Sequence, residues 1–437
     1  MKKQILLIVT IIYLLNFLGV ATEITKKDVL SVQSGNFFLE GKPFAEISFN
    51  KFDLIWSIWS SAKQGDVIDA ANPIVKKQDE ALRELSANGF RTIRVFGMPY
   101  RMSDYWTIYS DKERRNSIYY KAIDKSLELC QKHHLKVVFT LGCTAFANDF
   151  AKSNKANIND GSEEDLSGFL SNPKSSMRQK LNSYLDETIN RYKNNKAIAM
   201  WEIANELTNL ADLPQIKNGE KQVTMQVISD FYSDVTAKIT SIDTLRLVNH
   251  GGSHLREHAY GLANGKDWKE RDSYSDHLSM YKMLHDDPNN KVIDIHYYAV
   301  AEDGYEIRDD AGYPFFLNLK EYKKIADTLG KPLYLGEYAA LPKDKTPNKK
   351  NDEFWKKHPD YFETFDGDNE AAQKWVQKAL DDLVESGISL THLWCYQSDR
   401  EMDQKDPQRM DLDLQRTPVL FKMVVVANKK LKAKIIP

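Results

Sequence analysis

Short apolar runs alternate with amphipathic stretches along almost the whole chain, and this alternation constrains the fold more than any other feature. The apolar runs are bounded by Gly, Pro or polar residues, as strands are. Eight runs have this form: residues 44–49, 90–96, 136–141, 198–204, 246–249, 292–298, 332–338 and 388–396. The main stretches with helical periodicity are residues 78–88, 117–134, 177–192, 222–242, 319–329 and 369–385. Strands that alternate with helices predict an α/β fold with a parallel sheet.

Several helical stretches end in a stop signal directly before the next strand. Gly89, Gly330 and Gly387 each supply a residue that readily adopts the left-handed conformation in which helices end. Eight strands in this order predict a (β/α)8 TIM barrel with long loops on its C-terminal face. A doubly wound open sheet is the structural alternative.

Three further features describe how the chain is organised around the predicted barrel. A small N-terminal hairpin is expected at residues 34–44, with a Glu-Gly turn, and it could plug the barrel floor. Long segments follow strands three, five and seven, at residues 144–175, 255–291 and 340–368, on the face where barrel enzymes build their sites. Since no repeat, low-complexity tract or linker divides the chain, residues 22–437 are expected to form a single domain.

Residues 1–21 have the layout of a secretory signal peptide. Two lysines precede an apolar run over residues 5–18, and small residues end the segment at Ala21. The run is shorter than the roughly 20 residues of a membrane span, and an uncleaved anchor is the alternative. We therefore expect bacterial export to the periplasm or the medium, with no membrane attachment after cleavage.

The charge balance and the absence of short motifs exclude several classes of partner. The 437 residues carry 60 Lys plus Arg and 62 Asp plus Glu, a formal charge of -2. There is thus no basic excess for contacts with a nucleic-acid backbone. Three cysteines do not make a disulfide framework, and no CxxC, HExxH or P-loop sequence is present. We expect a monomer with no metal, no organic cofactor and no nucleic-acid partner.

Two carboxylates stand at the C-terminal ends of two predicted strands. The fourth run leads into Asn205 and Glu206, and the seventh leads into Glu337. Burying a charge costs free energy unless the charge is paired or used. Cleavage of a glycosidic bond requires two carboxyl groups that flank the bond, one protonated and one ionised.

On these residues the chain resembles the retaining glycoside hydrolases of clan A and, within them, glycoside hydrolase family 5. The resemblance spans nearly the whole of residues 22–437. It rests on an Arg on strand two, an Asn-Glu pair on strand four, His-Tyr-Tyr on strand six, a Glu on strand seven and a Trp on strand eight: Arg94, Asn205, Glu206, His296, Tyr297, Tyr298, Glu337 and Trp394. It implies that Glu206 is the general acid and base, and that Glu337 is the nucleophile.

The resemblance also implies roles for the residues around the two carboxylates. Arg94 and Tyr298 would donate hydrogen bonds to Glu337 and favour its ionised form. Asn205 would bind the sugar 2-hydroxyl, and His296 would orient the acid side of the site.

Period-two alternation predicts which side chains share a face of their strand. His296 and Tyr298 should point into the site together. By the same alternation, Leu333 and Leu335 are expected on the same side as Glu337.

Aromatic residues follow several strand ends and are candidates for contacts with sugar. Trp394 would be the platform under the reacting sugar and would precede a cis peptide. Trp56 and Trp106 are candidate substrate-binding residues. Further aromatics that either pack or line sugar subsites are Trp59, Tyr100, Tyr105 and Tyr396.

Other polar residues admit a structural interpretation beside the functional one. Glu202 is interpreted as the buried partner of an arginine such as Arg94 or Arg246 rather than as a catalyst. Histidines recur every fourth residue at 250, 254 and 258, but the glycines at 251 and 252 break any helix there. A metal site is therefore disfavoured, and a sugar contact from His250 or His254 remains open.

The sequence predicts a secreted retaining β-glycoside hydrolase that cleaves a β-linked polysaccharide or oligosaccharide by double displacement. The end of the hairpin, residues 41–44, is similar to the entry of the family's mannanase branch, which favours an endo-β-1,4-mannanase. An endo-β-glucanase, another clan A glycosidase or transglycosylase, and a non-catalytic carbohydrate-binding protein are the alternatives. Two departures from the family leave the substrate open: no His follows strand three, and Leu207 replaces a common Pro.

Overall fold

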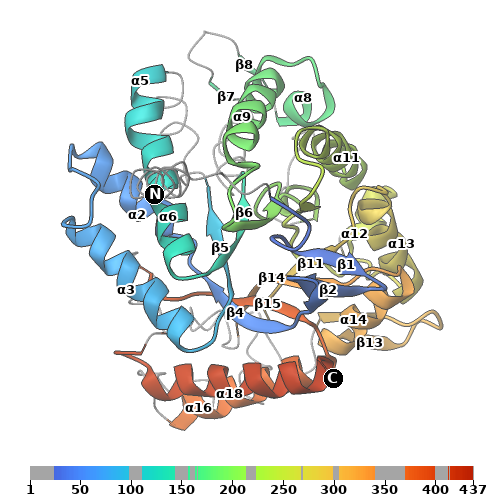
Figure 1. The fold of residues 1–437 in the computed structure, drawn as a ribbon. Helices are drawn as coiled ribbons and strands as arrows, with labels where there is room; N and C mark the ends of the chain where they lie inside the picture. The colour runs from blue at the N-terminus through green and yellow to red at the C-terminus, as the bar shows by residue number, and fades with distance from the viewer. Residues whose placement is uncertain are drawn as a thin grey trace, which may run out of the picture.

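The computed structural model describes residues 24–97, 111–142, 156–157, 163–164, 166–212, 223–266, 269–298, 305–339, 370–398, 412 and 414–436. Eight strands stand at the centre of the molecule and helices surround them (Figure 1). The strands are β4 (Glu46–Asn50), β5 (Thr92–Phe96), β6 (Lys136–Thr140), β9 (Ile198–Glu202), β10 (Leu247–Asn249), β11 (Ile293–Tyr298), β14 (Leu333–Ala339) and β15 (Leu390–Leu393). Each coincides with one of the eight predicted runs.

The order of the strands is that of a barrel. The sheet runs β10-β9-β6-β5-β4-β15-β14-β11, and all its ladders are parallel. Its first and last strands in sequence, β4 and β15, pair with each other, so that Leu390 lies opposite Glu46. The predicted (β/α)8 TIM barrel is therefore confirmed, and the open sheet is excluded.

The strands β10 and β11 stand at the two ends of this order, and the side chain of Asp294 joins them. Both carboxylate oxygens of Asp294 on β11 accept backbone N–H groups from the chain after β10: His250 donates at 3.0 Å, and Gly252 donates to the other oxygen. The N–H of His254 then donates to the carbonyl of His296 at 3.1 Å. These bonds close the seam between the two strands.

The predicted helix boundaries are set by caps that the sequence encodes. Asn72, Ser273 and Asn318 accept backbone N–H groups as N-caps of three helices. Gly89, Gly330 and Gly387 have φ of 85°, 67° and 71°, as predicted for residues that end helices. The helices are α2 (Leu54–Lys63), α3 (Pro73–Ala87), α5 (Lys112–Arg114), the π-helical η1 (Arg115–Tyr120), α6 (Lys121–Lys132), α8 (Leu166–Ser171), α9 (Ser176–Tyr192), α10 (Asn209–Asp212), α11 (Met225–Ile242), α12 (Ala259–Ala263), α13 (Tyr274–His285), α14 (Leu319–Thr328), α16 (Glu370–Ser386) and α18 (Pro418–Ile435).

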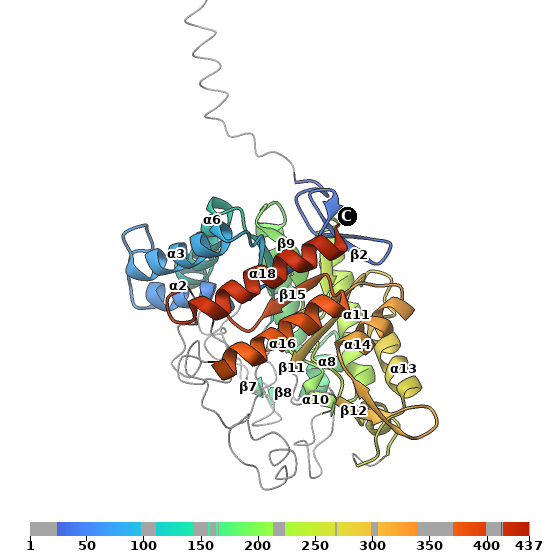
Figure 2. The same ribbon diagram turned by 90° about the horizontal axis from the view of Figure 1, so that it is seen from below.

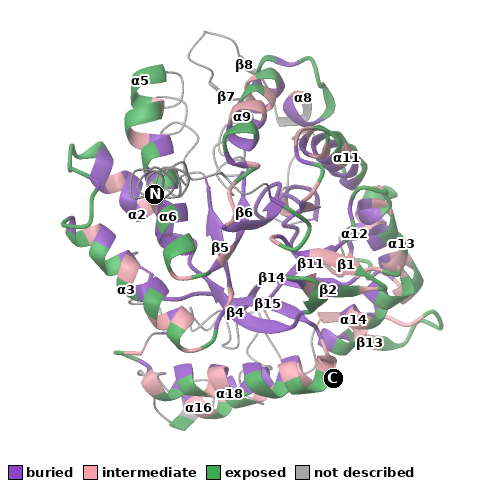
Figure 3. Cartoon of the chain, in the orientation of Figure 1, coloured by how far each residue is buried: buried purple, intermediate pink, exposed green. Residues whose placement is uncertain are grey.

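The burial pattern separates the barrel from its surroundings. The strands are buried along their length, whereas the surrounding helices bury one side and expose the other (Figure 3). The long segment 255–291, expected as a loop, contains α12 and α13. Two short ribbons decorate the barrel: β12 (Tyr305–Arg308) with β13 (Pro314–Leu317), and β7 (Ala156–Asn157) with β8 (Glu163–Glu164). None of the helices in the described ranges is long and apolar enough to cross a membrane.

The predicted N-terminal hairpin covers the barrel floor. It forms a three-stranded sheet of β1 (Ser31–Gln33), β2 (Asn36–Leu39) and β3 (Lys42–Pro43), with a turn at Glu40 and Gly41 in which φ is 57° and 75°. Its apolar side chains pack in one cluster with side chains at the starts of the barrel strands: Leu30, Phe37, Leu39, Phe44, Val138, Ala199, Met200, Val292, Tyr334 and Leu390. Figure 2 shows this sheet at one end of the barrel. The plug predicted from the sequence is thus confirmed.

Candidate active site

A buried arginine organises the polar centre of the barrel. Arg94 on β5 is fully buried, and its guanidinium donates to four side chains. Nη1 donates to Glu337 at 2.8 Å and to Asn50 at 2.9 Å, Nη2 donates to Asn205 at 2.7 Å, and Nε and Nη2 both donate to one oxygen of Glu202. The interpretation of Glu202 as a buried arginine partner is therefore confirmed. A rigid planar fork is suited to fixing several acceptors at once.

Each oxygen of Glu337 receives a donor from a different strand. Oε1 accepts from Arg94 on β5, and Oε2 accepts from the phenol of Tyr298 on β11. The Glu337 side chain is only 5% exposed. Burial, followed by the charges of Glu337 and Glu206, raises the pKa of Tyr298 well above its ordinary value, so the phenol stays a donor.

The alternation predicted for strand seven is wrong at one position. Leu333 and Leu335 pack in the outer hydrophobic core, whereas Tyr334 belongs to the cluster on the barrel floor. The ladder with β11 skips Gly336, so that Ile295 lies opposite Leu335 and His296 lies opposite Glu337. This β-bulge inserts one extra residue, and it turns Glu337 inward although Leu335 points outward. The glycine is required there because a Cβ would lie 2.7 Å from His296 Nε2.

Glu206 leaves the end of β9 in an unusual backbone conformation. Its φ is 56°, which a non-glycine residue adopts only at a cost. Two backbone bonds hold it: its N–H donates to the carbonyl of Gly251 at 2.7 Å, and its own carbonyl accepts from Asn209 at 3.1 Å. The Glu206 side chain is 22% exposed, more than that of Glu337.

His296 points into the site together with Tyr298, as their shared parity predicted, and it lies between the two carboxylates. Its Nδ1 is 3.1 Å from Glu206 Oε1 and 3.6 Å from Glu337 Oε2. Burial opposes a charge on this imidazole, but the Glu337 charge and the hydrogen bond to Glu206 outweigh burial and raise its pKa. The two carboxylates and Nδ1 bring ligand atoms within 4.8 Å of one another.

The structure also places Asn205 and Trp394 at this end of the barrel. Asn205 precedes Glu206, and its side-chain oxygen is turned toward Arg94. The Trp394–Cys395 peptide is cis, as predicted. The Trp394 ring stacks on Phe52, with the ring centroids 4.5 Å apart and an interplanar angle of 11°.

The other aromatic candidates are distributed differently. Trp56 lies on α2, half-buried against the hydrophobic core, and within the described ranges no hydrogen bond or ring contact links it to the two carboxylates. Tyr396 is buried, packs on Phe421 and donates to Glu84, so it belongs to the barrel wall rather than to a sugar subsite. Trp106, Tyr100 and Tyr105 lie outside the described residues.

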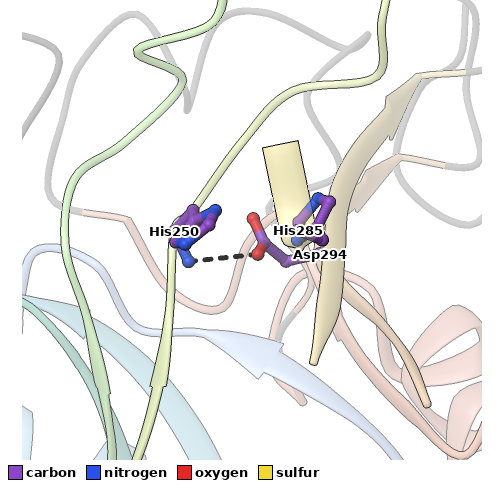
Figure 4. A group of neighbouring side chains, drawn as sticks. All are labelled: His250, His285 and Asp294. Carbon is purple, nitrogen blue, oxygen red and sulfur yellow. Dashed lines mark hydrogen bonds between the residues drawn. The ribbon is translucent and has the colours of Figure 1, made fainter. Parts of the chain in front are cut away.

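A second cluster within the described part of the chain has the composition of a metal site. His250, His285 and Asp294 are all buried and bring three ligand atoms within 4.8 Å of one another (Figure 4). The side-chain oxygen of Asn290 accepts from Val292, so its amide nitrogen faces the two imidazoles, at 3.0 Å from His250 Nε2 and 2.9 Å from His285 Nδ1. Burial lowers the pKa of both imidazoles, that of His285 to about 3. The two imidazoles are therefore neutral, and each accepts a hydrogen bond from the Asn290 amide. We interpret the cluster as structural, since it joins the barrel to the end of α13.

Several residues of the site were not singled out from the sequence. Asn50 accepts from Arg94 and donates to the carbonyls of Gly336 on β14 and His392 on β15, which ties the end of β4 to the next two strands of the barrel. Thr140 donates to Glu202 at 2.7 Å. Asn50 ends an apolar strand, as Asn205 and Glu206 do, so the same signal could have found it.

Comparisons with known proteins agree with this geometry. The family model described as cellulase, glycosyl hydrolase family 5, matches residues 54–396. The matched range covers most of the chain, and the members of this family are glycoside hydrolases. The chain belongs to glycosyl hydrolase family 5.

Solved structures share the fold at low sequence identity. The endo-1,4-beta-mannanase from Rhizomucor miehei aligns with a TM-score of 0.60 and 14% identity over 93% of this chain and 99% of that one. The endo-beta-1,4-mannanase from Thermotoga petrophila aligns with a TM-score of 0.56 and 14% identity over 90% and 78%. No curated protein matches the sequence.

Proposed function

We propose that this glycoside hydrolase cleaves β-1,4-linked mannan with net retention, with Glu206 as acid and base and Glu337 as nucleophile. The observation that carries the proposal is the separation of the two carboxylates, whose nearest oxygens lie within 4.8 Å. Retaining enzymes hold their carboxyl groups about 5 to 5.5 Å apart, whereas inverting enzymes hold them about 6.5 to 9.5 Å apart to leave room for a water molecule. The short distance between the oxygens of Glu206 and Glu337 therefore favours retention.

The different surroundings of the two carboxylates support the division of roles. Glu337 accepts from Arg94 and Tyr298, which hold both of its oxygens in place, so it is the carboxylate that attacks the anomeric carbon. Glu206 is the more exposed of the two, and it protonates the glycosidic oxygen as the bond breaks. In the second step Glu206 takes a proton from water, the water oxygen attacks the anomeric carbon, and Glu337 is released.

Around these two residues, the proposal assigns the sugar contacts to neighbouring side chains. Asn205 binds the 2-hydroxyl, with its amide oriented by Arg94. Trp394, stacked on Phe52 by one ring face, offers the other face to the sugar. Trp56 and Trp106 are proposed for more distant sugar units.

Mannan is favoured because the compared structures from Rhizomucor miehei and Thermotoga petrophila are named as mannanases. The hairpin at residues 41–44 supports the same branch. A β-1,4-glucan is the second candidate, since the matching family model is described as cellulase.

The decisive experiment incubates the protein with β-mannan, β-glucan, xylan and galactan, sizes the products and follows the anomeric protons by NMR. Glu337→Gln should abolish the products, whereas Glu385→Gln, an exposed carboxylate on α16, should leave them unchanged. Early release of the β-anomer supports retention. Release of the α-anomer, or carbohydrate binding without turnover in the unmodified protein, would overturn the proposal.

We further propose that residues 1–21 direct export and that the mature enzyme is monomeric. A polysaccharide must be met outside the cell membrane, which supports export. N-terminal sequencing of the protein recovered from the periplasm or medium, with its mass in solution, tests both points.

A further inference from the structure

We propose that Asn209 and Arg256 form a positioning pair that holds the Glu206 carboxyl group and sets the pH range in which it acts as an acid. This inference rests on the proposed function, since it concerns the same carboxylate. Neither residue is among the site residues on which the resemblance to the family rests.

The Glu206 carboxyl group is held on both of its oxygens. Asn209 lies three residues after Glu206, at the start of α10, and its Nδ2 donates to Glu206 Oε2 at 3.0 Å. His296 Nδ1 contacts the other oxygen, Oε1, at 3.1 Å. The plane of the carboxyl group is therefore fixed by an amide and an imidazole.

Arg256 determines which way the Asn209 amide faces. The amide oxygen accepts from Ser253 Oγ at 2.6 Å and from Arg256 Nη2 at 3.0 Å. A guanidinium only donates hydrogen bonds, so the atom that faces Arg256 must be the oxygen. The NH2 group of Asn209 is consequently directed at Glu206 as a donor, and a rotated amide would leave two donors facing each other.

Arg256 is itself held from two sides. Its Nη1 donates to the carbonyl of His254 at 2.7 Å, and its backbone N–H donates to Asp212 at 2.8 Å. The His254 ring stacks on Tyr305, with the centroids 3.8 Å apart. His254, for which a sugar contact was left open, thus supports the pair.

A donor to the carboxylate favours its ionised form. In the proposed first step Glu206 acts as the protonated acid and Glu337 carries the negative charge. Once Glu337 is bonded to the sugar that charge is gone, and the Asn209 donor helps Glu206 to act as the ionised base.

Other titratable groups also surround Glu206. They are His296 and Tyr298 on β11, Glu337 on β14, Tyr305 on β12, Tyr232 on α11 and Arg256 after β10. Substituting Asn209 leaves all of them in place.

The test compares the pH dependence of kcat/KM for the unmodified enzyme, Asn209→Ala and Arg256→Met. On the basic side of the profile, kcat/KM falls as the acid loses its proton, and this fall is called the basic limb. Loss of the donor should move the basic limb to higher pH, by about one pH unit in Asn209→Ala, and in the same direction in Arg256→Met. Asn190→Ala, on the exposed side of α9, is the matched control and should leave the limb in place. A uniform loss of rate with an unmoved limb in both variants would overturn the proposal, because a merely structural role gives that result.

A second measurement does not need turnover. Carboxyl ¹³C NMR follows the titration of Glu206 in the unmodified protein and in the same variants. An upward displacement of that titration supports the positioning pair even if no glycan is hydrolysed, and identical titrations refute it. If Asn209→Ala does not fold, Arg256→Met carries both measurements.

Discussion

The backbone N–H of Glu206 donates to the carbonyl oxygen of Gly251 at 2.7 Å, and both residues have positive φ, 56° and 71°. A Cβ on residue 251 would lie 1.8 Å from the carbonyl oxygen of Ala204. The glycine thus allows the ends of two neighbouring strands to approach closely enough for the proposed acid to be held in a left-handed conformation.

Gly251→Ala should therefore lower both stability and activity. The added methyl group must push the two strand ends apart, and we expect the free energy of unfolding to fall by about 2 to 4 kcal/mol. Gly387→Ala is the matched control, since Gly387 also has φ of 71° but has no atom within 4 Å of the added carbon. It should cost about 1 kcal/mol and leave kcat unchanged. Urea unfolding and initial rates measure both effects, and equal losses in the two variants would contradict the argument.

Arg94→Lys should damage both the fold and the reaction. A lysine cannot replace the planar fork that joins Glu202, Glu337 and Asn205, so buried acceptors lose their donors. We expect a loss of about 2 to 4 kcal/mol in unfolding free energy and roughly a hundredfold or more in kcat. Arg246→Lys is the control, because Arg246 is also buried but pairs with Asp243 away from the site. It should destabilise the protein and preserve kcat.

Tyr298→Phe removes only the phenolic donor to Glu337 Oε2. Since Arg94 still holds the other oxygen, kcat should fall by roughly 10 to 100-fold, with a change in unfolding free energy of about 1 kcal/mol or less. The next residue in the chain, Tyr297, donates its phenolic hydrogen to the carbonyl of Leu317 instead. Tyr297→Phe should therefore retain full activity. Steady-state kinetics and thermal unfolding distinguish the two; an active Tyr298→Phe enzyme would argue against this role.

Asp294 should make stability depend on pH. Burial raises its pKa from 3.8 to about 6, although the N–H groups of Gly252 and His250 oppose that change. Between these pH values the folded protein holds a proton that the unfolded chain has released, so this residue's contribution to stability falls as pH rises. Relative to Asp294→Asn, the unfolding free energy should decline by at most about 3 kcal/mol from pH 4 to pH 6. Urea unfolding at several pH values tests this, and parallel pH profiles for the two proteins would refute it.

The barrel could be predicted from the sequence because its signals are local. Each strand is a short apolar run, and Gly89, Gly330 and Gly387 mark three helix ends by a property of single residues. The carboxylates at the ends of strands four and seven could be predicted for the same reason. Helices α2, α13 and α18 were not singled out, since they lie in segments interpreted as loops or left unassigned.

The remaining features depend on contacts between distant segments. Period-two alternation predicted that Leu335 and Glu337 lie on the same side of their strand. The bulge at Gly336, which puts them on different sides, shows only in the ladder with β11. Asp294 closes the seam by reaching N–H groups 42 and 44 residues away in sequence. No local pattern identifies such a partner, because the order of the strands in a barrel does not say how neighbouring strands are offset or which side chains bridge them.

The closed barrel floor determines how the molecule would be oriented on a solid support. Ile24, the first described residue, leads into the floor hairpin, and the last turn of α18 is tied to the same side by Lys432, which contacts Glu46 at the start of β4. Figure 2 shows the labelled C-terminus toward the same end of the molecule as β2. A tether or a resin coupled directly before Ile24 or directly after α18 would therefore hold the enzyme by its floor, with Glu206 and Glu337 turned toward an insoluble polymer.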